Sequence, residues 1–323
     1  MDIQKNRIRN IVGGIYDIQK LRIATGNRIV ASLRPGLVEE VKEGEEDTKY
    51  LPAILSEYRR ITDYFVSEFE GRGSIEKAIT PNNPEYIKSR LDYDLVTSYK
   101  RLLETEEGLT KVAEREVKAH PMWDAFFAGV KGCGPLMSAV CLAYFDPYKA
   151  RHASSFWRYA GLDVQRDPDK DKMRGVGKWY TEERPYIDKD GKEQMKKSLT
   201  YNPFLKTKLV GVLGSAFLRA KDSYYGKVYY DYKNRLDNRD EDFSPIVKHR
   251  MATRYAVKMF LRDMWVVWRE LEDLRSPSLM RSPSWATSLT TLNIGYRSLL
   301  VTLRSQVYLR TLVARVSQVY PAV

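Results

Sequence analysis

The sequence predicts a mainly α-helical protein, with a helical N-terminal region, a long coiled-coil arm and a compact helical C-terminal domain. Three observations lead to this expectation. Apolar residues recur at intervals of three and four over several long segments of the 323-residue chain, which is the period of one helix face. Proline and glycine separate these segments. Strand-like segments do not alternate with helix-like ones, which argues against a doubly wound α/β fold.

The N-terminal region, residues 1–83, is expected to be basic and helical. Residues 16–33 place apolar side chains at helical spacing, and Pro35-Gly36 should end that helix. A second apolar stripe begins at Ile54 and stops at Gly71.

Residues 84–121 read as one long charged helix that ends at Pro121. Its apolar stripe runs from Ile87 to Val117, and charges of both signs occupy the other faces. Such a stripe is equally typical of an ordinary core face. The length favours a partner helix, so we expect this arm to form a homodimer.

Residues 122–273 should form the compact domain. We predict helices at 136–144, 153–160, 204–221, 225–236 and 247–272. The polar segment between the second and third of these helices should hold a hairpin around "YIDKDGKEQ" and a mobile basic loop. Residues 274–323 hold six Arg and no Lys, Asp or Glu. We interpret them as an atypical basic tail, hypothesise that it is a frameshifted or degenerate end, and assign no function to it.

The net charge points to an anionic partner. The chain has 54 Lys and Arg against 42 Asp and Glu, a formal net charge of +12, and such a balance is typical of nucleic-acid-binding proteins. Solubility combined with a basic tail is the alternative explanation.

The cysteine and histidine content excludes several classes of site. Cys133, Cys141 and three histidines are too few for a disulfide framework or a zinc site, so we expect no metal and no cofactor. The chain has no run of 18 apolar residues and no signal-peptide core at its start. We therefore expect no membrane association and a cytoplasmic location.

The segment "VKGCGPLMSA", residues 130–139, fits the glycine turn of a helix-hairpin-helix motif. Glycines let a backbone approach a phosphate closely, and Pro135 suits the first turn of the next helix, whose N–H groups face the anion. We expect Lys131, Gly132 and Gly134 to contact phosphates. A nucleotide loop is disfavoured because no Gly-Lys-Ser/Thr follows, and a catalytic Cys133 because no base is paired with it. A purely structural turn remains open.

Basic residues interleaved with aromatic ones suggest a path for nucleic acid. Positive groups pair with phosphates while rings stack on unpaired bases, so Tyr224, Tyr225 or Tyr232 are possible stacking residues. A polar loop with a tucked-in ring, and a solvated helix face, are the alternatives. The candidate residues are Arg158, Lys172, Arg174, Lys178, Trp179, Lys206, Lys208, Lys248, Arg250, Arg254 and Lys258.

Together with the glycine turn, the segments "ASSFWRYAGLDVQ", residues 201–236 and residues 249–271 resemble the C-terminal domain of the insertion-sequence-110 family of transposases. The resemblance covers about residues 122–273. That family also has a nuclease-like domain with four acidic residues, and a nucleophilic serine soon after its Tyr-Ala-Gly-Leu box. This N-terminus is basic and helical, and no serine lies between Leu162 and Ser198. We therefore expect no catalysis.

A helical arm before a basic helical domain also resembles the Nop domain of guide-RNA particles. The closest plan is that of the nuclease-free Tas proteins, which accompany tandem interspaced guide RNA arrays in prokaryotes and their viruses. This resemblance implies a non-enzymatic protein that holds a small guide RNA and directs RNA-guided binding of DNA. The alternatives are a recombinase with a relocated serine (Ser154, Ser155 or Ser198) and a domesticated transposase remnant.

Overall fold

The protein is mainly α-helical, as predicted, with two small antiparallel hairpins in the part of the chain described here. The computed structural model describes residues 3–33, 49–69, 72–167, 169, 171–239 and 243–274. The predicted stops at Pro35-Gly36 and Gly71, and the tail after Leu274, lie outside these residues. The chain divides into an N-terminal unit up to Ala113 and a C-terminal unit from Glu114.

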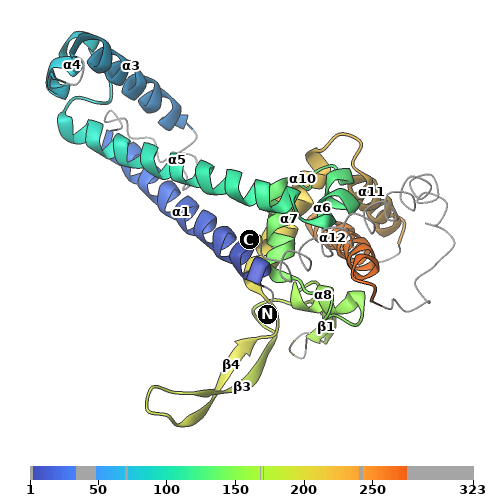
Figure 1. Ribbon diagram of the computed structural model, residues 1–323. Helices are drawn as coiled ribbons and strands as arrows, with labels where there is room; N and C mark the ends of the chain where they lie inside the picture. The colour runs from blue at the N-terminus through green and yellow to red at the C-terminus, as the bar shows by residue number, and fades with distance from the viewer. Residues whose placement is uncertain are drawn as a thin grey trace, which may run out of the picture. The chain divides into compact units, whose positions relative to one another are not determined.

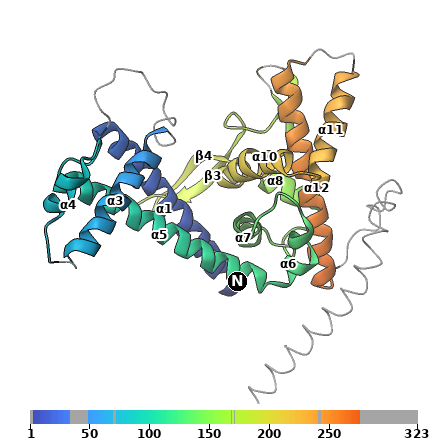
Figure 2. The ribbon, with the colours of Figure 1, turned by 90° about the horizontal axis from the view of Figure 1, so that it is seen from above.

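The N-terminal unit is built from four described helices, and α1 is longer than the spacing predicted. They are α1 (Ile3–Leu33), α3 (Leu51–Phe69), α4 (Ile75–Asn82) and α5 (Arg90–Lys118), whose last residues belong to the C-terminal unit. Within this unit α1 runs beside α5 (Figures 1 and 2). Arg22 of α1 joins them, with its Nε 2.7 Å from Glu106 and its Nη1 2.8 Å from the Tyr99 hydroxyl.

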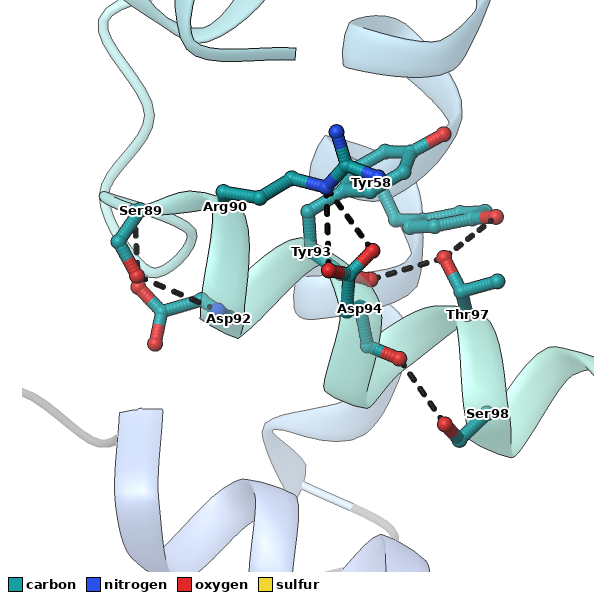
Figure 3. Close-up of polar contacts among 8 residues, drawn as sticks. All are labelled: Tyr58, Ser89, Arg90, Asp92, Tyr93, Asp94, Thr97 and Ser98. Atoms are coloured by element: carbon teal, nitrogen blue, oxygen red, sulfur yellow. Dashed lines mark hydrogen bonds and ion pairs between the residues drawn. The ribbon is translucent and has the colours of Figure 1, made fainter.

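The predicted arm begins at Arg90 rather than at residue 84. Glu57 of α3 accepts backbone N–H groups of residues 85, 86 and 87, which holds that stretch out of a helix. Ser89 and Asp92 then form a capping box: the Ser89 hydroxyl accepts the Asp92 N–H at 3.2 Å, and the Asp92 carboxylate accepts the Ser89 N–H at 2.9 Å. This reciprocal pair fixes the helix start (Figure 3).

Part of the arm's apolar stripe packs within its own unit. The Tyr93 ring stacks on Tyr58 of α3 with centroids 4.8 Å apart, and Thr97 donates to the Tyr58 hydroxyl at 3.2 Å (Figure 3). Val96 and Tyr99 are buried, whereas Leu91 is exposed. The core-face alternative therefore accounts for these residues, and self-association through the arm stays a prediction.

The C-terminal unit is a group of helices around an aromatic core that includes Phe127, Phe217, Phe260 and Trp265. The predicted helices are present to within a few residues, although the run from 203 to 219 contains a π-helical segment. The helices are α6 (Pro121–Ala125), η1 (Phe127–Gly129), α7 (Pro135–Tyr144), α8 (Ala153–Tyr159), α9 (Pro203–Lys206), η2 (Thr207–Leu213), α10 (Gly214–Arg219), α11 (Tyr224–Asp237) and α12 (Pro245–Leu271).

Two hairpins lie between α8 and α9. The predicted hairpin is confirmed and is longer than expected: β3 (Thr181–Ile187) pairs with β4 (Glu193–Leu199). A second hairpin was not predicted: β1 (Val164–Asp167) pairs with β2 (Lys172–Gly175), in the segment where a hairpin and a mobile basic loop were expected. Both strands are polar, so the period-2 signal of a strand is missing. An ion pair of 2.9 Å between Arg174 and the buried Asp167 carboxylate ties them together.

Candidate nucleic-acid interface

The Tyr-Ala-Gly-Leu box is a helix stop. Gly161 follows α8 with a φ of +67°, and its N–H bonds to the Arg158 carbonyl. The N–H of Leu162 bonds to the Trp157 carbonyl at 2.9 Å. These two bonds define a Schellman motif, in which a glycine adopts the left-handed conformation. The stop turns the chain sharply and places Asp163 directly beyond the C-terminal end of α8.

Two cations of α12 lie against this turn. The Arg254 guanidinium donates to the Asp163 carbonyl at 3.3 Å and lies on Gly175, where any β-carbon would collide with it. One turn later, the Lys258 carbonyl accepts the indole N–H of Trp157 at 2.9 Å. The Lys258 ammonium lies 5.3 Å from the centroid of the same indole ring. α8 and α12 pack against each other (Figure 2), which brings Lys258 onto Trp157 and Arg254 onto the turn after α8.

A third cation comes from α9. The Lys206 ammonium donates to the carbonyl of the buried Val176, which follows β2, and lies 4.8 Å from the centroid of the Tyr201 ring. Its α-helix is capped by Asn202, whose side chain accepts the Leu205 N–H. Arg158, at the end of α8, is exposed and lies 3.4 Å from Glu182 of β3.

We call Arg158, Lys206, Arg254 and Lys258, together with Asp163, the basic cluster. Burial raises the pKa of Asp163, and the charges of Lys258, Arg158 and Arg254 oppose that rise. Burial, and then the charge of Arg254, lower the pKa of Lys206 to about 8. Burial also lowers the pKa of Arg254 and of Lys258. The charges of Lys258, Arg158 and Arg254 thus act on the Asp163 carboxylate, and Lys206 adds a further positive charge next to Arg254. Lys206, Arg254 and Lys258 are half-buried.

A bound phosphate group would neutralise the excess positive charge of the basic cluster. Removing cations from water is costly unless each is paired, and Lys206 and Arg254 also repel each other. An arriving anion supplies the missing charge without requiring the side chains to reorganise. Charge-assisted hydrogen bonds to phosphate are among the stronger polar contacts that proteins make.

The "KMRGVGKWY" residues form β2 and the stretch directly after it. The Arg174 guanidinium lies 5.7 Å from the centroid of the Trp179 ring, and the Trp179 indole N–H donates to the Gly175 carbonyl at 3.2 Å. The ring is therefore fixed on the hairpin, as the tucked-in alternative expected. Lys172 and Lys178 are exposed.

The remaining candidates on helices have other surroundings. Lys248 forms an ion pair of 2.9 Å with Asp237 of α11. Lys208 lies over the Phe204 ring, with its ammonium 5.7 Å from the ring centroid, and burial lowers its pKa. Arg250 is exposed one turn before Arg254, so it extends the same face of α12.

The glycine turn has a packing reason as well as a proposed binding role. Gly132 has a φ of +96°, and a β-carbon there would lie 3.1 Å from the Ala216 carbonyl oxygen of α10. Ser223, which caps α11, donates its hydroxyl to the Lys131 carbonyl at 3.2 Å. Open space surrounds the position of a β-carbon at Gly134. The close approach at Gly132 is therefore to protein, and phosphate contacts by Lys131, Gly132 and Gly134 stay predictions.

The side chains considered for catalysis have ordinary environments. Burial raises the pKa of Cys133 to about 12, which keeps the thiol protonated and unreactive. The Ser198 hydroxyl donates to the Glu182 carbonyl at 3.5 Å, and Ser154 and Ser155 lie in the first turn of α8. Among the described residues, no group of three or more His, Cys, Asp or Glu side chains is placed to hold a metal ion.

Two of the tyrosines suggested for base stacking are already packed. Tyr225 is buried and donates to the Asp263 carboxylate at 3.0 Å. The Tyr232 ring stacks on Tyr255 with centroids 4.2 Å apart, and the Arg235 guanidinium lies over both rings. Tyr224 is exposed. Stacking on Tyr225 is therefore wrong for this fold, because its ring faces the core.

Comparison of the chain with protein-family models, with curated proteins and with solved structures found no match. None of the described helices is long and apolar enough to cross a membrane.

Sequence reasoning missed two members of this site, Asp163 and Trp157. Asp163 follows the Tyr-Ala-Gly-Leu box immediately, and a carboxylate two residues after a helix-stopping glycine is a usable signal of a fixed position. Trp157 precedes Arg158, so an aromatic ring next to a cation was present in the sequence. Neither signal shows which distant lysine lies on the ring.

Proposed function

We propose that this chain is a non-enzymatic RNA-binding protein that holds a guide RNA through the basic cluster and presents it for RNA-guided binding of DNA. One observation carries the proposal. Arg254 and Lys258 are half-buried near the Asp163 carboxylate, and the half-buried Lys206 adds a further positive charge that acts on Arg254. The resulting excess of positive charge, kept partly away from water, suits a phosphate backbone.

The choice of RNA rests on the sequence resemblance to the nuclease-free Tas proteins, since phosphate contacts alone do not distinguish RNA from DNA. The exposed Lys172, Lys178 and Arg250 would extend the contact along the strand. Their exposure allows each to neutralise one phosphate, which makes binding depend on salt.

The test is purification of the full chain from cells that carry its surrounding genomic region, followed by sequencing of the bound RNA. The expected result is a discrete small RNA, which the protein binds in preference to unrelated RNA. Equilibrium binding of that RNA should weaken steeply between about 50 and 200 mM salt, as multiple phosphate contacts require. A protein that emerges free of RNA, and binds added RNA without salt dependence, contradicts the proposal.

A further inference from the structure

The β3–β4 hairpin projects from the helices of the C-terminal unit (Figure 1). Side chains on both of its faces are exposed, including Ile187 at 74% and Met195 at 60%. A two-stranded hairpin without a covering layer is marginally stable in water. Such a ribbon gains stability when another molecule covers one face.

The register separates the charges of the hairpin by face. Residues that pair directly across an antiparallel ladder lie on the same face. On one face Glu183 is opposite Lys197, a favourable pair. On the other face Arg184 is opposite Lys196, so two like charges face each other. Such a pair is destabilising on its own. A bound anion makes its contribution to stability favourable, because both positive groups then face a negative charge.

The same face continues with an aromatic ring. Tyr186 is opposite Gln194, to which its hydroxyl is bonded at 3.2 Å, and the Lys196 ammonium lies 5.9 Å from the centroid of the Tyr186 ring. At the base of this face, Glu182 lies 3.7 Å from Arg184 and 3.4 Å from Arg158. The one carboxylate is thus divided between two guanidinium groups. We call Arg184, Tyr186, Gln194 and Lys196 the cationic face.

We propose that the cationic face of this hairpin binds in the major groove of double-stranded DNA. The major groove of B-form DNA is about 12 Å wide and admits a two-stranded ribbon, whereas the groove of A-form RNA is too narrow and deep. Arg184 and Lys196 lie on different strands, so each contacts the phosphates on its own side of the groove. This inference goes beyond the RNA-binding proposal and does not depend on it, although Arg158 lies next to both surfaces.

The chain offers a matched pair of variants. Lys196→Gln and Lys197→Gln remove the same charge from neighbouring residues on opposite faces of β4. We expect Lys196→Gln to weaken binding of a 24-base-pair DNA duplex by about tenfold near 100 mM salt, and to lower the slope of log K against log salt by about 1. Adding Arg184→Gln should lower that slope by about 2 in total. Lys197→Gln should leave both values unchanged.

Differences in stability between the two variants cannot produce the expected difference in DNA binding. Lys196→Gln relieves the repulsion with Arg184, whereas Lys197→Gln loses the pair with Glu183, so the control is the variant expected to unfold at the lower temperature. Fluorescence anisotropy with labelled duplex DNA measures binding, and thermal unfolding measures stability. Equal losses of DNA affinity in both single variants, or none in either, overturn the inference.

The same variants distinguish this inference from the RNA-binding proposal. If the wild-type chain binds single-stranded RNA but not duplex DNA, the hairpin inference fails and RNA binding stands. If Lys196→Gln weakens RNA binding and leaves duplex DNA unaffected, the cationic face serves RNA and the inference also fails. Binding of duplex DNA that depends on Lys196, in a chain that binds no RNA, supports the hairpin and contradicts the proposed function.

Discussion

Replacement of Asp163 by asparagine separates a nucleic-acid site from a structural ion-pair cluster. The substitution keeps the shape of the side chain and removes the carboxylate on which Lys258, Arg158 and Arg254 act. In a structural cluster this change would destabilise the protein. At a phosphate site it removes a repelling charge, so Asp163→Asn should bind RNA more tightly than the wild type.

The magnitude follows from Coulomb's law. Arg254 donates to the backbone carbonyl of Asp163 at 3.3 Å. For a phosphate bound to the far side of that guanidinium we take a separation of roughly 7 Å from the Asp163 carboxylate. Two unit charges at roughly that separation repel by about 0.6 kcal/mol in water and about 2.4 kcal/mol at an effective dielectric constant of 20. An intermediate value of about 1 kcal/mol corresponds to about fivefold tighter binding.

The stability of the free protein should change little. Burial raises the pKa of Asp163 despite the nearby cations, so the fold disfavours the ionised carboxylate, and its loss should alter the free energy of unfolding by less than about 1 kcal/mol. Fluorescence titration of a labelled RNA measures affinity, and urea unfolding measures stability. Weaker RNA binding by a folded Asp163→Asn protein would refute the reasoning.

Two further predictions use other residues of this region. Lys206 has a pKa near 8, so RNA affinity should fall as the pH rises through 8, and Lys206→Gln should flatten that profile. The RNA-free protein should become more stable between pH 8 and about 10.4, because the unfolded lysine then holds a proton that the folded one has lost; a flat stability profile would contradict the assignment. Gly161→Ala should cost about 2–4 kcal/mol in urea unfolding, because φ is positive and a β-carbon would lie 2.5 Å from Tyr201. Gly211→Ala, where a β-carbon meets open space, should be neutral or stabilising, and equal losses would show that the turn geometry is not the cause.

The sequence was sufficient for the helices and insufficient for the polar strands. The 3.6-residue period located α8 and α12, because their apolar faces are continuous. It missed β1 and β2, which have no apolar alternation and depend on the Arg174–Asp167 ion pair and on Arg254 lying against Gly175. A pattern based on burial cannot detect strands that polar contacts hold together.

The cluster shows the same limit for the candidate site. Lys206 was a candidate because it lies near the start of a predicted helix, and Arg254 and Lys258 because their spacing places them on one helix face. These residues come together only through the turn at Gly161 and the packing of α8 against α12, and the sequence pattern does not show either feature. Lys248, in the first turn of α12, lies outside the cluster and pairs with Asp237 at the end of α11.

The most direct test of the account is the salt dependence of RNA binding in a double variant of the cluster. Lys206→Gln combined with Lys258→Gln should lower the slope of log K against log salt by about 2. The matched control removes two exposed lysines of the N-terminal unit, Lys77→Gln and Lys111→Gln, and should keep the wild-type slope. Equal slopes in the wild type and the cluster variant would contradict the account, because the cluster would then contact no phosphate.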